Sequence, residues 1–190
     1  MSDLNDFLEY AEEENDYSSI AGYLCEFPVE DLVNVGEPLL EPILKQLSYY
    51  EGEFDPIHGT WKRKYGMGFH IVDYYAQAAK VLGKIGDKRV VKPLIEMFGL
   101  REIMDMGFSK EHEEAAIAAL TNIGKPAVRP LITALGTTDS EFWDGDEVRT
   151  CAVKALVEIG EPSVKLLTKA LERKNEDVKK AAKLALEKIK

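Results

Sequence analysis

His112 and Glu113 stand next to each other and are the residues of this 190-residue chain best suited to metal chemistry. An imidazole nitrogen and a carboxylate oxygen are both common metal ligands, but one such pair cannot supply the ligand set of a metal site. His58 and His70 have no second histidine within helical reach, whereas zinc requires three or four converging ligands. We therefore expect no metal site and no catalytic residue, and we expect His112 to be a partly exposed residue at the start of a helix.

Two other stretches match ligand-binding motifs only in part. Residues 66–71 read "GMGFHI", which has two glycines of a dinucleotide fingerprint but lacks the third and follows no strand. Residues 139–147 read "DSEFWDGDE", in which Gly145 stands at the seventh instead of the sixth position of a calcium loop. Asp144 or Asp146 is instead expected to cap the helix that follows, and no cofactor is expected.

A short basic stretch, "WKRKY" at residues 61–65, could stack its rings on bases and neutralise phosphates. Five residues are too few for a nucleic-acid interface, and a loop that keeps its charges in water explains them as well. The net charge of −10 also repels a phosphate backbone. The sequence therefore disfavours nucleic acid as a partner.

The chain repeats one sequence motif, and the fold of this repeat must position the residues described above. The motif reads "VGEPLLEPILKQL" from residue 35, "IGKPAVRPLITAL" from residue 123 and "IGEPSVKLLTKAL" from residue 159. Counted back from the glycines at 86, 124 and 160, apolar residues recur at positions −8 (Ala78, Ala116, Ala152), −4 (Leu82, Leu120, Leu156) and −1 (Ile85, Ile123, Ile159). This spacing places them on one stripe of a helix. Each unit therefore predicts two helices, joined by a turn in which glycine takes the left-handed conformation.

Prolines mark the second helix of each unit. One set follows the turn glycine by two residues and is expected at the first helical position, where a missing N–H costs nothing; it comprises Pro38, Pro126 and Pro162. A second set falls inside the helix and predicts a slight bend; it comprises Pro42, Pro93 and Pro130. Neither helix can bury its stripe alone, so we predict that successive pairs stack.

A family resemblance rests on two of these units, "EHEEAAIAALTNIGKPAVRPLITAL" and "DGDEVRTCAVKALVEIGEPSVKLLTKAL". They resemble HEAT-like repeats of the phycobilisome-lyase (PBS lyase) type, and the resemblance is strong over about residues 70–190. It implies an α-solenoid, a fold that this family uses mostly for holding other proteins. Because a repeat pattern specifies a fold and not a site, the resemblance carries over no catalytic residue.

The same resemblance implies two enzyme alternatives. One is a subunit similar to bilin lyases, which attach bilin chromophores to antenna proteins. The other is a metal-dependent enzyme similar to deoxyhypusine hydroxylase, which gathers His-Glu pairs from four repeats. Here the positions equivalent to His112-Glu113 are Tyr74-Tyr75, Val148-Arg149 and Val178-Lys179, so the second alternative lacks its ligands.

The repeats predict one α-solenoid domain over residues 1–190. An irregular N-terminal cap is expected over residues 1–34, with short amphipathic helices that bury Leu4, Phe7, Leu8 and Tyr10 or Ala11. The remaining units are a degenerate repeat at 35–49, HEAT-like repeats at 70–99, 110–136 and 146–173, and a C-terminal half-repeat cap at 175–190.

The connections between repeats differ most from one another and concentrate the aromatic residues. Residues 49–69, 99–111 and 137–146 hold nine of the 17 aromatic residues in 44 positions. Because such connections emerge along one edge of a solenoid, and aromatic residues often dominate binding energy, we predict a partner-binding edge. Its candidate residues are Trp61, Tyr65, Met104, Met106, Phe108, Phe142 and Trp143. The alternative is that these side chains pack onto the solenoid.

Charge is distributed unevenly along the chain. Residues 1–60 hold 15 acidic residues and one basic residue (−14), whereas residues 61–190 hold 23 basic and 19 acidic residues (+4). The acidic stretch is either a solvated surface, which we favour, or a surface for a basic partner.

The two cysteines and the short apolar runs limit which classes of protein this chain can belong to. Cys25 and Cys151 lack CxxC spacing and are both expected in the core. Apolar runs fall far short of the ~20 residues that cross a bilayer, so we expect a soluble, cytoplasmic protein without a membrane partner. The sequence thus predicts a non-catalytic scaffold or adaptor that binds another protein through its inter-repeat loops or concave helix face, with an enzyme subunit as the alternative.

Overall fold

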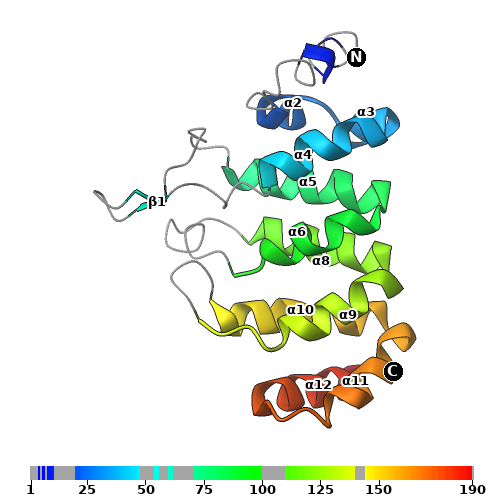
Figure 1. Cartoon of the computed structure of the whole chain (residues 1–190). Helices are drawn as coiled ribbons and strands as arrows, with labels where there is room; N and C mark the ends of the chain where they lie inside the picture. The colour runs from blue at the N-terminus through cyan, green and yellow to red at the C-terminus, as the bar shows by residue number, and fades with distance from the viewer. Residues whose placement is uncertain are drawn as a thin grey trace.

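Antiparallel helix pairs stack on one another along the chain (Figure 1). The computed structural model describes residues 4, 6, 8–10, 20–47, 54–55, 60–61, 71–99, 110–139 and 144–189. Helix α2 (Ile20–Glu26) and helix α12 (Glu176–Lys188) lie at opposite ends of the stack (Figure 1). The predicted all-α solenoid is confirmed.

Short helices form the N-terminal end. Helices α2 and α3 (Val29–Val35) pack against the first long helix, α5 (Ile71–Ile85), and the 3₁₀ turn η1 (Glu37–Leu39) continues into α4 (Leu40–Leu47). Leu4 and Leu8 are buried, as the amphipathic pattern predicts, and Tyr10 is 57% exposed. Phe7 and Ala11, the other residues of that pattern, lie outside the described residues.

The later units share one plan, in which a long first helix is followed by a shorter second helix. The pairs are α5 with η2 (Lys88–Val90) and α6 (Val91–Glu96), α8 (Glu111–Ile123) with α9 (Lys125–Ala134), and α10 (Gly145–Ile159) with α11 (Glu161–Ala170). Helix α8 packs between α5 and α10, and α12 packs against both α10 and α11. None of the described helices is both long enough and apolar enough to span a membrane.

A glycine joins the two helices of each pair. Gly124 and Gly160 have φ of 70° and 72° with ψ of −127° and −134°, which differs from the predicted left-handed conformation in ψ but is still a region that only glycine enters readily. Each donates its N–H to the carbonyl of the leucine four residues earlier, at 3.0 Å for Gly124 and 3.2 Å for Gly160. The glycine therefore ends the first helix and begins the second.

The predicted apolar stripe lies in the interior. Counted back from the glycine, or from Lys190 in the last unit, position −8 is fully buried throughout (Ala78, Ala116, Ala152 and Ala182). Position −4 is fully buried at Leu82, Leu120 and Leu156, whereas the isoleucines at position −1 are half-buried. Position −12 is buried as well, at Tyr74, His112, Val148 and Val178. The first helices thus bury three successive turns of one face.

The prolines differ slightly from expectation. Pro126 and Pro162 stand at the second helical position, where the N–H would still have no helical partner. Pro130 lies inside α9, which continues as an α-helix on both sides of it. In the two earlier units the second helix begins as a 3₁₀ turn, before Pro42 and Pro93. The bend at these prolines stays a prediction.

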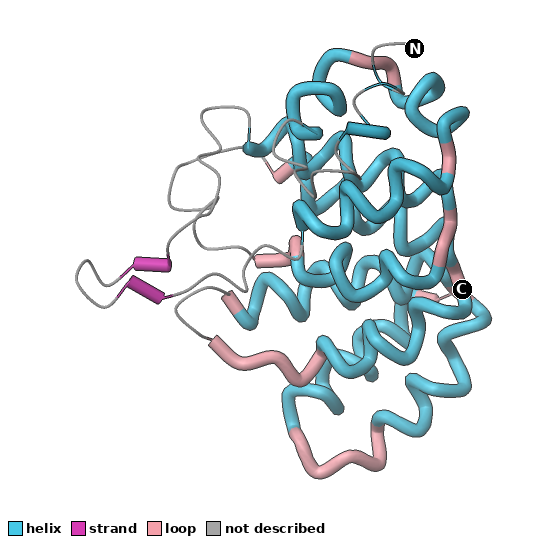
Figure 2. The backbone as a smooth tube through the Cα atoms, turned by 45° about the horizontal axis from the view of Figure 1, so that its top comes forward, coloured by secondary structure: helices cyan, strands magenta, loops and turns pink. Residues whose placement is uncertain are grey.

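One prediction from the sequence, a buried Cys25, is wrong, and one pair of strands was not predicted. Cys25 is exposed, not in the core, because Leu24 takes the buried position and the next residue points about 100° further around α2. Cys151 is buried as expected. A pair of two-residue strands, β1 (Phe54–Asp55) and β2 (Thr60–Trp61), lies apart from the helix stack (Figures 1 and 2).

Candidate functional site

The predicted aromatic edge falls almost wholly outside the described residues. Of its candidates, Trp61 is placed in β2 by its backbone, opposite Phe54 of β1. The remaining candidates lie outside the described part of the chain: Tyr65, Met104, Met106, Phe108, Phe142 and Trp143. His58 and His70 lie outside it as well. Binding by the edge stays a prediction.

Hydrogen bonds join the connection that begins at Gly99 to the connection that contains Asp144. The Gly99 N–H donates to a carboxylate oxygen of Glu113 at 2.9 Å, and the Asp144 N–H donates to the Gly99 carbonyl at 2.9 Å. The Asp144 carboxylate accepts from the Glu147 N–H at 3.0 Å, which confirms the expected helix cap. Through Gly99, Glu113 therefore links the start of α8 to the residue that caps α10.

Glu113 is the most buried carboxylate among the described residues, at 2% exposure, and it lies beside Glu147 and Cys151. Burial raises the pKa of Glu113 above its ordinary value, the Gly99 N–H opposes this, and the nearby Glu147 adds to it. Lys110 contacts Glu147 at 2.7 Å and Glu113 at 4.0 Å, and the hydrogen bond to Glu147 raises the Lys110 pKa. One ammonium thus serves two carboxylates.

This cluster has metal-ligand chemistry but fits a metal ion poorly. Ligand atoms of Glu113, Glu147 and Cys151 lie within 4.8 Å of one another. Without a metal the pKa of Cys151 is raised, first by burial and then by the two carboxylates, so the thiol keeps its proton. Lys110 and Gly99 already occupy carboxylate oxygens. The carboxylates of this cluster are therefore already bonded within the protein, which favours a structural role.

His112 corrects an expectation. It is 1% exposed, not partly exposed, because it occupies position −12, where the other units place Tyr74, Val148 and Val178 in the interior. The signal was present in the sequence, since positions −12, −8 and −4 form one stripe. His112 is therefore buried by the repeat itself.

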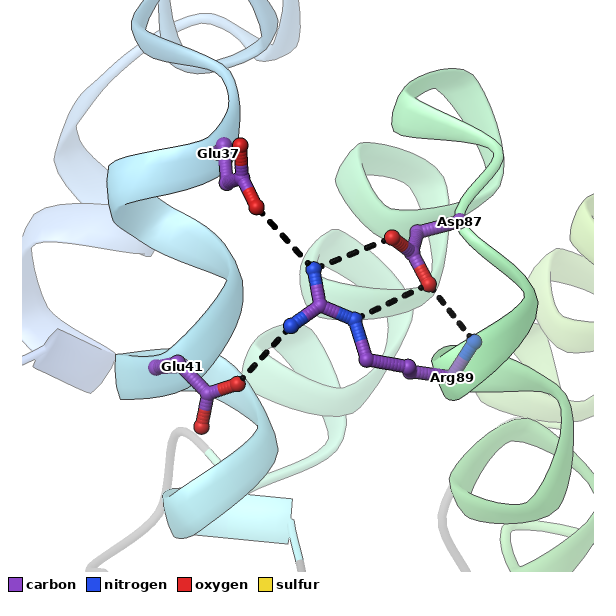
Figure 3. A network of polar contacts seen from close by, with 4 residues as sticks. All are labelled: Glu37, Glu41, Asp87 and Arg89. Carbon is purple, nitrogen blue, oxygen red and sulfur yellow. Dashed lines mark hydrogen bonds and ion pairs between the residues drawn. The ribbon is translucent and has the colours of Figure 1, made fainter.

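On the face formed by the second helices, Arg89 and Lys92 of the N-terminal half form ion pairs (Figure 3). The Arg89 guanidinium contacts Glu37 and Glu41 at 3.2 Å each and Asp87 at 3.0 Å, so it joins η1 and α4 to η2. The hydrogen bond from Arg89 lowers the pKa of Asp87. On α6, Lys92 contacts Glu96 at 3.3 Å.

The C-terminal half of the same face differs. A groove of about 190 Å³ lies between α9 and α11 and is lined by Arg129, Ile132, Leu166, Lys169, Ala170 and Arg173. Its three cationic side chains are exposed, and none of them forms an ion pair with another described residue. None of the lining residues is acidic.

The groove was not predicted from the sequence. Arg129 and Arg173 belong to different units, and only the packing of α9 against α11 brings them to one hollow. The available signal was the charge of the second helices: α9 has two basic and no acidic residues, and α11 has two basic residues and one acidic residue. A groove with an apolar floor and unpaired cations is suited to hold a ligand that is both apolar and anionic.

Comparisons with known proteins agree with this geometry. A family model described as HEAT repeats matches residues 98–187, and one described as PBS lyase HEAT-like repeat matches residues 75–99. A search of curated proteins gives no match. The matched residues run from within α5 to within α12, across the units that share the turn glycine and the buried stripe. The chain is a HEAT-like repeat protein of the PBS lyase type.

Proposed function

We propose that the chain is a non-catalytic scaffold that holds a partner protein against the second helices of its last two full repeats. The observation that carries this proposal is the groove between α9 and α11, where three cations without a described ion-pair partner surround an apolar floor. Surfaces that combine apolar contact with arginine are typical of binding faces.

The electrostatics of the described residues support the choice of this face. Lys110 pairs with Glu147 and lies near the buried Glu113, and Arg89 contacts three carboxylates. The groove between α9 and α11 instead offers three exposed cations that form no ion pair with a described residue. HEAT repeats are commonly protein-binding modules, which agrees with this role.

The aromatic connections are proposed as a second contact surface, because Trp61 and Trp143 would extend the interface along the edge of the stack. The acidic stretch over residues 1–60 is proposed as the place where a basic part of the partner docks.

Affinity capture tests the scaffold role. The immobilised chain is incubated with native lysate, retained proteins are identified by mass spectrometry, and the purified pair is measured by calorimetry. We expect a protein that binds the folded chain with defined stoichiometry and does not bind a resin carrying the heat-denatured chain. If the folded and denatured resins retain the same proteins, the scaffold proposal is wrong.

The loop edge is tested with the same partner. Trp61→Ala together with Trp143→Ala should weaken binding by at least ~2 kcal/mol, the scale of an interface hot spot, and should leave the melting temperature nearly unchanged. Normal binding with a much lower melting temperature would mean that these side chains pack onto the solenoid.

The match of residues 75–99 to a PBS lyase HEAT-like repeat is compatible with a second candidate, a bilin-lyase-like subunit. Mixing the chain with a free bilin and an antenna apoprotein distinguishes the two. Covalent transfer of bilin, seen as a mass increase of the apoprotein and a visible absorption band, would favour the enzyme. The scaffold proposal expects neither change.

A further inference from the structure

We infer that the groove between α9 and α11 binds an acidic peptide segment that places one apolar side chain on the groove floor. This inference deepens the proposed scaffold function and rests on it. It names the chemistry of the partner at one site: an extended stretch of aspartate and glutamate interrupted by a leucine-like residue.

The floor of the groove sets the size of what can enter. Ile132 is 3% exposed, Ala170 is 1% exposed, and Leu166 is half-buried. The volume of about 190 Å³ is smaller than the roughly 300–1,000 Å³ of typical small-molecule pockets. The groove therefore suits one or two side chains of a longer segment and does not suit a whole cofactor.

The rim of the groove sets the charge of what can enter. Arg129 on α9, Lys169 on α11 and Arg173 just beyond α11 are all exposed around the apolar floor. A guanidinium can bind a carboxylate through two parallel hydrogen bonds, so two arginines favour planar carboxylates in particular. Since no described acidic side chain satisfies these three cations, an acidic ligand would do so without displacing an internal partner.

The cationic surface also continues along both helices. Lys125 precedes Arg129 by one helical turn on α9, and Lys165 precedes Lys169 by one turn on α11. Both lysines are exposed. A segment that runs along the groove would therefore meet cations over more than one turn, which favours an extended peptide over a single anion.

The rest of the molecule argues against a nucleic-acid ligand. Half of the lining residues are apolar, whereas a phosphate backbone gains little from an apolar floor. The net charge of −10, concentrated in residues 1–60, would repel a polyanion long enough to extend past the groove. A short acidic peptide, in contrast, would contact only the cationic surface around the groove.

A synthetic probe tests the inference directly. The probe is a fluorescein-labelled peptide of sequence EDELDEE, and its binding to the full chain is followed by fluorescence anisotropy. We expect saturable binding that weakens steadily as salt rises past ~0.15 M, where the screening length is about 8 Å. The same peptide with serine in place of leucine should bind at least about fivefold more weakly, because the apolar contact is lost.

Matched variants locate the binding site. Arg129→Glu together with Lys169→Glu should weaken the leucine peptide by at least about tenfold, because two favourable charges become repulsive. Lys80→Glu together with Lys154→Glu, at exposed cations on the first helices α5 and α10, reverses the same number of charges and should change affinity by less than about twofold. Circular dichroism melts check that all variants are folded.

Three outcomes would overturn the inference. The first is an equal loss of affinity in the first-helix control, Lys80→Glu with Lys154→Glu, and in the groove variant, which would indicate general charge attraction. The second is tighter binding of an eight-nucleotide oligothymidine at the groove than of the peptide. The third is salt-sensitive self-association of the wild type that the groove variant abolishes, which would make a second copy of the chain the occupant.

The groove variant also separates this inference from the scaffold proposal. If a partner captured from lysate binds the wild type and the groove variant equally, the scaffold role stands and the groove inference fails. If the wild type captures no partner but binds the leucine peptide through the groove, the scaffold proposal fails on its own test.

Discussion

Glu113 is a carboxylate held inside the helix stack, and its neighbours account for its position. It accepts the Gly99 N–H, lies within 4.0 Å of Lys110 and sits beside Glu147. A buried carboxylate without such partners would be strongly destabilising. Its hydrogen bond with Gly99 holds the start of the connection between α6 and α8, so Glu113 stabilises this edge of the stack.

Glu113→Gln should make stability less dependent on pH. The folded pKa of Glu113 is raised above its unfolded value, so the ionised carboxylate costs stability above the folded pKa, and this cost disappears as pH falls towards the unfolded value. The wild type should therefore gain stability relative to Glu113→Gln as the pH falls from neutral towards 4.5, the ordinary value of this pKa. Urea titrations of both proteins at each pH measure the difference, and a difference independent of pH would contradict the raised pKa.

Gly83 tests how closely two first helices approach. A Cβ atom built on Gly83 of α5 would lie 2.5 Å from the Cβ of Ala119 on α8. Gly83→Ala should therefore destabilise the protein by roughly 1–3 kcal/mol through overpacking. The control is Gly22→Ala on α2, where a Cβ atom meets nothing within 4 Å and the change should stabilise by up to ~1 kcal/mol. Denaturant melts in which Gly83→Ala equals the wild type would mean that α5 and α8 can separate at little cost.

At the scale of the helices, the turn glycines and the buried stripe follow from local rules, and the sequence predicted both. Alanine at −8 and leucine at −4 repeat with the helical period, and Asp144 caps α10 as a short acidic side chain before a helix should. The exposure of Cys25 could not be predicted, because it depends on how far α2 is rotated against α5. The helix period fixes relative faces within a helix but not the rotation of a short terminal helix.

The groove between α9 and α11 could not be predicted from the sequence either, because it too depends on how helices pack. Its cations are unremarkable surface residues in each unit taken separately, and only the packing of α9 against α11 gathers them over Ile132 and Ala170. The pairing of Arg89 with Glu37 and Glu41 likewise links units that are far apart in sequence. Which cations are paired and which stay open is therefore a property of the stack.

The last helix, α12, should be required to keep the stack soluble. Its buried residues, Val178, Ala181, Ala182 and Ala185, pack against α10 and α11. Truncation after Lys174 would expose the apolar surface that α12 covers, so we expect aggregation and binding of a hydrophobic dye. Size-exclusion chromatography checks this, and a monomeric, cooperatively folded truncation would show that α12 is not a cap.

At the scale of the whole molecule, contacts run from each unit to the next. Helix α8 packs on α5 and α6 before it and on α9 and α10 after it, and α10 in turn packs on α12. Stability in such a stack is approximately a sum of unit and interface contributions. A change in a central unit should therefore weaken both flanks, whereas a change in a terminal unit should act on one side only.

Leu120 and Val178 provide the comparison. Leu120 of α8 is fully buried in the middle of the stack, so Leu120→Ala should cost roughly 2–5 kcal/mol of unfolding free energy. Hydrogen exchange should then speed up in α5 and α10 as well as in α8, because both rely on the α8 interface. Val178→Ala on α12, where the side chain is 2% exposed, should speed exchange in α12 and its neighbours α10 and α11 but not in α5. A loss below ~1 kcal/mol for Leu120→Ala, or faster exchange confined to α8, would mean that the units do not depend on one another as the contacts indicate.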